Sequence, residues 1–410
     1  MEAPKGSLVI GGAGLKSISQ FTLETIMHIE KANQVFYCVS DPIAEGFIRS
    51  KNANAEDLYQ YYSNSKERMA TYIQMAEVML KAVREGLQVV GIFYGHPGFF
   101  VGPAHRAIAI ALDEGYSARM LPGISSMDCL FADLLIDPAD HGCQIVEATE
   151  ILVRGRTLQT STNVILFQVG CIGVTGFHLT DMKNPHFQSL VDRLEKDYGL
   201  DHPVVDYRAA TSPLEESSIN RHTIADLRKP EVQEGISTAS TFYLPPKIAL
   251  PVVEGLEQLG LNPRMNCSPM MYPPHPFNAS LFPASSPYGD MEMEAIASLR
   301  SDTGLEGYRP YSASIAMQKT MESLSTNIGA IEKYKASPKD FVAAITGLEL
   351  SEEKALESGS ADLVKSVMHG YQDEKFTTAI IKGTAAIIKG TTAIIKGTTA
   401  IIKDTTTPPH

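Results

Sequence analysis

The sequence predicts an α/β domain followed by a small helical domain and an extended C-terminal peptide. From residue 7 to about residue 245, short apolar runs alternate with segments of helical periodicity, which is the pattern of an α/β fold. Proline-rich sequence and short helical segments follow, and the chain ends in four near-copies of the heptad TTAIIKG that begin at Thr377. We therefore expect three domains, at 1–247, 248–370 and 371–410.

The α/β part consists of strands and helices that follow one another along the chain. Strands are expected at 7–14, 34–39, 87–95, 117–123, 163–170 and 202–209, and helices at 22–32, 66–86, 103–115 and 187–199. Each of the first strands runs into a glycine-rich turn at its carboxyl end. Open α/β sheets bind their ligands at that edge, so the functional site is expected there.

The region beyond residue 260 has a different composition. The stretch 263–289 is too rich in proline for a regular helix or a central strand, which predicts an extended connector. Short helices are expected after it, at 291–302, 314–334, 337–347 and 350–370. The pair Ser337-Pro338 provides one of them with a capping residue and a proline at the first helical position.

The composition is that of an ordinary globular protein whose charge is unevenly distributed. Of the 410 residues, 44% are hydrophobic and 20% are charged. The net charge of −12 argues against nonspecific binding of nucleic acid, which needs clustered lysine and arginine. Residues 375–410 carry five lysines and one acidic residue, Asp404, so a basic tail follows an acidic body. This charge pattern favours binding of one part by the other.

Secretion, membrane insertion and metal binding are not predicted. The N-terminus lacks an apolar segment behind a basic start, and no run of about 20 apolar residues occurs. The five cysteines are scattered without a CxxC pair, which predicts reduced thiols and no metal site. They are Cys38, Cys129, Cys143, Cys171 and Cys267. We expect a soluble, cytoplasmic protein.

Three glycine-containing loops follow the expected strands. Gly11, Gly12 and Gly14 match part of the fingerprint of nucleotide-binding folds, but Ser17 stands where a third glycine is expected, so a tight turn is the alternative. The loop 94–100 combines glycine and proline with Tyr94, Phe99 and Phe100, which suits a flat adenine or a sulfonium methyl group. The segment 121–126 repeats the arrangement, with Pro122-Gly123 before two serines that begin a helix.

These loops resemble those of tetrapyrrole-methylase-like enzymes in order and interval, together with the segments 163–170 and 240–246. The resemblance implies a two-subdomain fold that binds S-adenosyl-L-methionine (SAM) and releases S-adenosyl-L-homocysteine. His96 departs from the Gly-Asp-Pro common in corrin and siroheme methylases, which argues against a tetrapyrrole substrate. The implied cofactor-binding residues are Tyr94, His96, Phe99, Ser125, Gln168, Tyr207, Ser240 and Thr241.

A second group of residues, Tyr59, Tyr62, Arg68 and Tyr72, surrounds a loop that leads into a long helix. Alone, the group could be an aromatic surface patch with a solvated arginine. Beside the loops above, it resembles the active-site residues of the borosin precursors, fused peptide α-N-methyltransferases that methylate their own C-terminal backbone. The resemblance covers residues 5 to about 370, and the helical segment 348–370 is similar to the leader-recognition region of that family.

Methylation of a backbone amide needs help, because the nitrogen lone pair is delocalised into the carbonyl group. A site must stabilise negative charge on the carbonyl oxygen and accept the N–H proton. The resemblance implies that Arg68 and Tyr62 stabilise the oxygen, that Tyr72 accepts the proton and that Tyr59 supports them.

The C-terminal heptads have several interpretations. A coiled coil is disfavoured, because the isoleucines are adjacent and Gly383, Gly390 and Gly397 interrupt any helix. Threonine and isoleucine favour strands, so a fibril-forming or anchoring tail is one alternative. The other is a multi-copy substrate, whose candidate methylated residues are Ala379, Ile380, Ile381, Ile387, Ile388, Ile394, Ile395, Ile401 and Ile402.

The borosin resemblance also implies partners: an interlocked homodimer that exchanges tails, and a later protease or macrocyclase. Two other functions stay open at this stage. One is a tetrapyrrole or small-molecule methyltransferase whose tail only mediates association. The other is an inactive descendant that serves as an interaction module, although it would have retained the whole tyrosine and arginine set.

Overall fold

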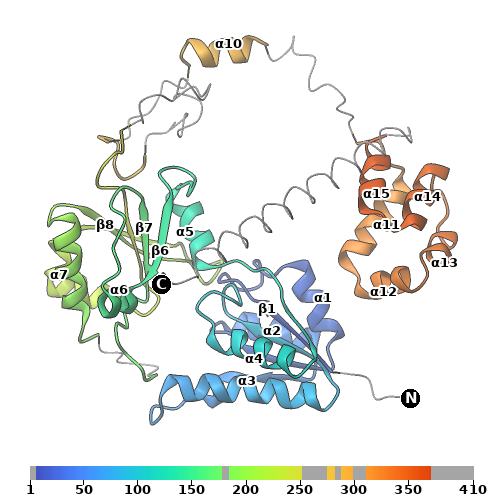
Figure 1. The fold of residues 1–410 in the computed structure, drawn as a ribbon, viewed down its shortest axis with the longest axis horizontal. Coiled ribbons are helices and arrows are strands. Elements are labelled where there is room, and N and C mark those ends of the chain that lie inside the picture. Colours follow the sequence, from blue (N-terminus) through green and yellow to red (C-terminus); the bar gives the residue numbers. More distant parts are fainter. Residues whose placement is uncertain (1–5, 178–183, 252–274, 282–287, 299–310, 371–410) are drawn as a thin grey trace, which may run out of the picture. The chain divides into compact units, whose positions relative to one another are not determined.

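The computed structural model describes residues 6–177, 184–251, 275–281, 288–298 and 311–370 (Figure 1). The chain divides into two units, Met1–Ser298 and Leu299–His410. The first unit contains two five-stranded sheets, and the second is helical in its described part.

The first sheet is parallel and has the strand order β3-β2-β4-β1-β5. Its strands are β1 (Ser7–Gly12), β2 (Gln34–Cys38), β3 (Ala55–Asp57), β4 (Gln88–Phe93) and β5 (Ser117–Met120). Helices α3 (Arg68–Arg84) and α4 (Gly102–Asp113) cover one face, where Met79 packs with Leu8. Helices α1 (Leu23–Lys31) and α2 (Pro42–Lys51) cover the other, where Ile48 packs with Val90. Because both faces are covered, the central strands are almost continuously apolar.

The second sheet is mixed and has the order β6-β7-β10-β8-β9. Strands β6 (Cys143–Glu147) and β7 (Asn163–Phe167) are parallel, whereas β8 (Pro203–Arg208), β9 (Ser218–Thr223) and β10 (Thr241–Leu244) pair antiparallel. Helix α5 (Ser126–Leu134) packs on one face. On the other face lie α6 (Ala148–Arg154), α7 (Phe187–Tyr198) and the short helices η2 (Asp226–Arg228) and α8 (Pro230–Gly235).

The predicted α/β fold and its six strands are confirmed, but four strands were missed. One of them is β10, a central strand of only four residues. Strands β3, β6 and β9 each lie at the edge of a sheet. An edge strand is partly exposed and alternates polar with apolar residues, so it lacks the apolar run by which the central strands were recognised. Helices α2, α6 and α8 were also missed; α6 and α8 have only seven and six residues, whereas α2 has ten.

The second unit is a small bundle around Met317, Val342 and Leu356. Its helices are α11 (Ile315–Thr326), α12 (Ile328–Ala336), α13 (Pro338–Ala343), α14 (Leu350–Ser358) and α15 (Ala361–Met368). The single helix expected at 314–334 is wrong: Asn327 ends α11 and caps α12 by accepting a hydrogen bond from the Ala330 amide. The segment 350–370 is likewise two helices. Ser337 caps α13, as predicted.

Several expectations fall outside the described residues. Most of the proline-rich connector, Cys267 and the whole tail 371–410 lie there, including the nine candidate methylation positions. Within the described ranges, Cys38, Cys129, Cys143 and Cys171 are free thiols. The same ranges contain no cluster of three or more possible metal ligands. Among the helices that can be described, none has the length and apolar character needed to cross a bilayer.

Candidate active site

A cavity of about 490 Å³ lies in the first unit, where the carboxyl ends of the first sheet's strands meet the second sheet. The first sheet contributes the loops after β1, β2, β4 and β5, and the second contributes the ends of β7 and β8 and the start of β10. The cavity therefore occupies the edge at which the sequence predicted a site. Its volume falls in the range of about 300–1,000 Å³ that is usual for small-molecule sites.

Two of the glycine loops join to form the floor of this site. Gly14 and Gly95 exchange backbone hydrogen bonds, with nitrogen–oxygen distances of 3.3 and 2.9 Å. Both have positive φ, +67° and +72°, a conformation that favours glycine. A Cβ atom on Gly12 would lie 2.3 Å from the Gly95 oxygen. Helix α1 begins only at Leu23, so the glycines form a tight turn and not a helix-start phosphate site.

One wall of the cavity is aromatic. The ring centroid of Phe99 lies 4.7 Å from that of Phe100 and 4.9 Å from that of Phe167, both edge to face. Tyr94 and His96 lie in the same loop and also line the cavity. The Nδ1 atom of His96 accepts a hydrogen bond of 3.0 Å from the Gly98 amide, which fixes the orientation of its ring. Burial raises the pKa of Tyr94 to about 12, so its phenol stays neutral.

Polar side chains that the fold holds in place form another part of the cavity lining. Ser125 caps α5, and its hydroxyl donates to the Asp128 carboxylate at 2.7 Å. Gln168 has a φ of +62°, an unusual conformation for a residue other than glycine, and the Cys171 thiol donates to its side-chain oxygen at 3.1 Å. Ser240 precedes strand β10 and Thr241 begins it, and both line the cavity. These groups can hold the polar parts of a ligand.

Tyr207 does not line the cavity with the other residues of the implied cofactor set. Its side chain is fully buried in the second sheet, and its hydroxyl donates to the Asp133 carboxylate of α5 at 2.7 Å. This bond ties β8 to the helix that Ser125 begins. Tyr207 therefore stabilises the position of α5, the helix that Ser125 caps, without lining the cavity.

Tyr59, Tyr62 and Tyr72 form one cluster on the remaining side of the cavity. The ring centroids of Tyr59 and Tyr62 are 5.1 Å apart. Burial raises the pKa of the Tyr72 phenol, whereas the charge of Arg68 and the Tyr62 hydroxyl oppose that rise. Tyr72 is thus the phenol whose ionised form its two neighbours stabilise.

Arg68 is the first residue of α3 and does not itself line the cavity. Its guanidinium donates to the Val174 carbonyl at 2.7 Å, and its backbone amide donates to the Thr175 carbonyl at 2.8 Å. The Arg68 charge also opposes the rise that burial causes in the pKa of the Cys171 thiol. Arg68 is therefore not a solvated surface arginine, and it joins the tyrosine cluster to the segment after β7.

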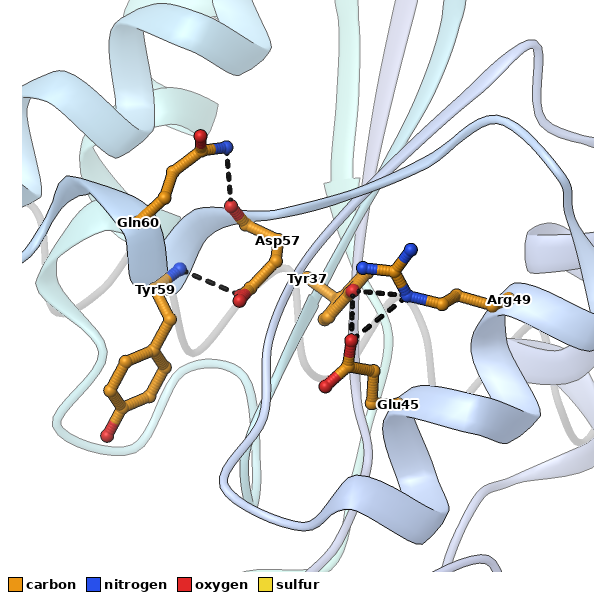
Figure 2. Close-up of polar contacts among 6 residues, drawn as sticks. All are labelled: Tyr37, Glu45, Arg49, Asp57, Tyr59 and Gln60. Carbon is orange, nitrogen blue, oxygen red and sulfur yellow. Dashed lines mark hydrogen bonds and ion pairs between the residues drawn. The ribbon is translucent and has the colours of Figure 1, made fainter.

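Tyr59 is oriented by its own short helix, η1 (Leu58–Tyr61) (Figure 2). Asp57 caps this helix by accepting a hydrogen bond of 2.8 Å from the Tyr59 amide. Behind it, the buried Tyr37 hydroxyl donates to Glu45 at 2.9 Å and accepts from Arg49 at 2.8 Å. Figure 2 shows the Tyr59 ring directed away from this ion pair. The Glu45–Arg49 ion pair therefore stabilises the region beside η1 and does not line the cavity.

Two families match the chain over separate stretches. Residues 7–228 match the Tetrapyrrole (Corrin/Porphyrin) Methylases, and residues 287–399 match the Borosin biosynthesis clasp domain.

The curated relatives combine both parts in one chain. A dendrothelin A precursor from Dendrothele bispora, described as a methyltransferase and ribosomally synthesized cyclic peptide precursor, is 46% identical, with 88% of each chain covered. The chain belongs to the borosin family. The omphalotin A precursor of Omphalotus olearius, described in the same way, is 45% identical with the same coverage. A type III borosin precursor from Anomoporia bombycina is 48% identical over 88% of this chain, which corresponds to 43% of that relative.

The borosin match confirms the family and the fold predicted from the sequence, and it makes this chain a methyltransferase that needs a methyl donor. It also disfavours the alternative of a small-molecule methyltransferase with an unrelated tail, because the clasp match reaches into the heptads. All the site residues named from the sequence line the cavity except Arg68 and Tyr207.

Sequence reasoning missed several residues of the borosin site. Phe177 stacks on Tyr62 with a ring centroid distance of 4.1 Å, and Cys38 and Thr238 line the cavity. No local motif marks any of them. Phe177 lies far from Tyr62 in sequence, so its place could only be found from the fold.

Proposed function

We propose that this chain transfers methyl groups from SAM to backbone amide nitrogens of its own C-terminal heptads and releases S-adenosyl-L-homocysteine. The observation that carries the proposal is the cavity itself, which combines an aromatic and polar wall with the Tyr59, Tyr62 and Tyr72 cluster. The relatives described as methyltransferase and peptide precursor in one chain add support, as does the heptad repeat that starts at Thr377.

The cavity suits SAM in size and chemistry. No Asp, Glu, Lys or Arg occurs among the described residues that line it, so a sulfonium cation would be held by aromatic faces and neutral dipoles. Tyr94 and Phe99 can contact the adenine or the sulfonium group. Gln168, Ser240 and Thr241 offer hydrogen bonds to polar groups. When bound, SAM supplies an electrophilic methyl group.

On the acceptor side, Tyr72 takes the amide proton and Tyr62 and Arg68 stabilise negative charge on the carbonyl oxygen. The Arg68 charge favours the ionised Tyr72 that proton removal requires. Arg68 already donates to Val174, so its remaining N–H groups are the ones available to a substrate carbonyl. Tyr59 packs against Tyr62 and supports it.

We assign residues 1–247 to the methyltransferase, 248–370 to the clasp and leader-recognition region, and 371–410 to the substrate. The acceptor nitrogens belong to the alanine and isoleucine positions of the heptads. An extended, β-prone peptide can pass through a narrow site one register at a time. Release of the peptide requires a separate protease or macrocyclase. The free thiols Cys129, Cys143 and Cys171 fit a reducing compartment, and we place the reaction in the cytoplasm.

Intact mass spectrometry tests this function. The full-length chain, incubated with SAM, is expected to gain mass in steps of one methylene group, whereas a chain ending at residue 376 gains none. The Tyr72→Phe full-length chain is the matched control for nonenzymatic methylation. A full-length chain that binds SAM and keeps its original mass would contradict self-methylation.

We also propose that the tail is delivered in trans within an interlocked homodimer. Mixing an active chain that ends at residue 376 with a full-length Tyr72→Phe chain is expected to methylate the full-length partner. The control mixes two Tyr72→Phe chains, one of them without its tail. If the first mixture stays unmethylated after coexpression, delivery in trans is ruled out.

A further inference from the structure

The segment 174–177 closes the tyrosine cluster from the side of the second sheet. It follows β7 and is joined to α3 by the two bonds that Arg68 makes, to the carbonyls of Val174 and Thr175. Gly173, just before it, has a φ of +67°, and its amide donates to the Thr149 hydroxyl at 3.1 Å. The backbone that leads to Phe177 is thus fixed at several points.

The Phe177 ring contacts two tyrosines of the cluster, Tyr62 and Tyr59. Its centroid lies 4.1 Å from that of Tyr62, with 27° between the ring planes, and 6.0 Å from that of Tyr59, edge to face. The three rings therefore form a compact triangle, in which Tyr62 contacts both Tyr59 and Phe177. A phenyl ring donates no conventional hydrogen bond and carries no charge, so it restricts the Tyr62 ring without competing for its hydroxyl.

The orientation of Tyr62 matters because the proposed function gives its hydroxyl a role at the substrate carbonyl. Tyr62 and Tyr72 line the same cavity, and a rotated Tyr62 ring would move its hydroxyl away from the oxygen that it is proposed to stabilise. Loss of the Phe177 ring would also admit water to a cluster whose phenols are largely buried. Both changes would affect the tyrosine cluster. They should not affect SAM binding, because Phe177 is not among the residues that line the cavity, whereas Tyr94 and Gln168 are.

We propose that Phe177 is a positioning residue for methyl transfer, which holds the Tyr62 ring in the orientation that its hydroxyl needs in the cavity. The inference rests on the proposed function and adds a residue to it. It predicts that substitution of Phe177 affects the methylation rate but not the binding of SAM. Substitution of Phe177 lowers the methylation rate at saturating SAM and leaves unchanged the SAM concentration that gives half of that rate.

Three full-length variants test the proposal. Phe177→Tyr keeps a ring that can stack and is expected to retain the wild-type rate within about twofold. Phe177→Leu keeps most of the volume but no ring, and Phe177→Ala removes both. These two are expected to slow methylation at saturating SAM by about 10- to 100-fold, because misplacement of a reacting group is costly. The rate is followed as methyl groups gained per chain in the intact mass.

Phe47→Leu is the matched control. Phe47 is also a partly buried phenylalanine with a ring neighbour, Phe21 at 5.4 Å, but it lies outside the cavity. It should lose stability without a change in the saturating rate. If Phe177→Leu is as fast as the wild type, or if its rate loss disappears at high SAM, the positioning role is wrong. Should the wild-type chain gain no methyl groups, the proposed function fails, and this inference fails with it.

Discussion

A Tyr72→Phe chain is expected to bind SAM with unchanged affinity and to methylate its tail at least about 100-fold more slowly than the wild type. The substitution removes one oxygen and keeps the ring that packs on α3 and α4, so the fold should persist. What is lost is the proposed proton acceptor of the reaction. Calorimetry measures SAM binding, and intact mass measures the rate.

The pH dependence gives this prediction a second readout. Burial raises the pKa of Tyr72 above its ordinary value near 10, so only a small fraction is ionised at neutral pH. That fraction grows about tenfold per pH unit below the pKa, so the wild-type rate should rise with pH and the residual rate of the variant should not.

Tyr61→Phe is the matched control, because the Tyr61 hydroxyl bonds to Glu56 at 3.2 Å outside the cavity. A wild-type rate in Tyr72→Phe, or equal losses in both variants, would remove Tyr72 from the chemistry.

A Gly170→Ala chain is expected to lose measurable SAM binding. A Cβ atom at this position would lie 1.9 Å from the Ser237 carbonyl oxygen and 2.8 Å from the Thr238 nitrogen, and both are backbone atoms that cannot rotate away. The segment that must move contains Thr238, Ser240 and Thr241, which form one wall of the cavity. Calorimetry is expected to show SAM affinity reduced by at least about 100-fold, since each displaced hydrogen bond to the ligand is costly.

Gly46→Ala is the control for this substitution. A Cβ atom there meets nothing within 4 Å, and Gly46 lies inside helix α2. Alanine should raise the free energy of unfolding by about 1 kcal/mol, because it is the better helix former. If Gly170→Ala binds SAM as tightly as Gly46→Ala does, the wall formed by 238–241 does not hold the cofactor.

The sequence predicted the longer central strands, because their burial on both faces gives them a continuous apolar run. It missed the central strand β10, which has only four residues, and the edge strands β3, β6 and β9, which are only partly buried. It also predicted the loops around Gly12, Gly95 and Ser125 as parts of one site. The carboxyl ends of parallel strands lie at one edge of the sheet, so the fold class alone brings these loops together.

What the sequence could not predict are contacts between distant segments. Arg68 and Val174 are 106 residues apart in the chain, and no motif near either residue predicts their hydrogen bond. The same holds for Phe177 on Tyr62. The resemblance placed Tyr207 in the cofactor set, whereas its hydroxyl is bonded to Asp133 behind the wall. A family motif identifies which residue occurs at a position, but the packing around it decides whether the side chain reaches the cavity.

Tandem mass spectrometry of the C-terminal fragment tests self-methylation most directly. The full-length chain is incubated with SAM that carries a deuterated methyl group, and the tail is then cleaved and sequenced. We predict deuterated methyl groups on backbone nitrogens within residues 377–403, at the alanine and isoleucine positions, and none in the Tyr72→Phe chain. A fragment without label, or label confined to lysine side chains, would contradict the assignment of this chain as a methyltransferase of its own backbone.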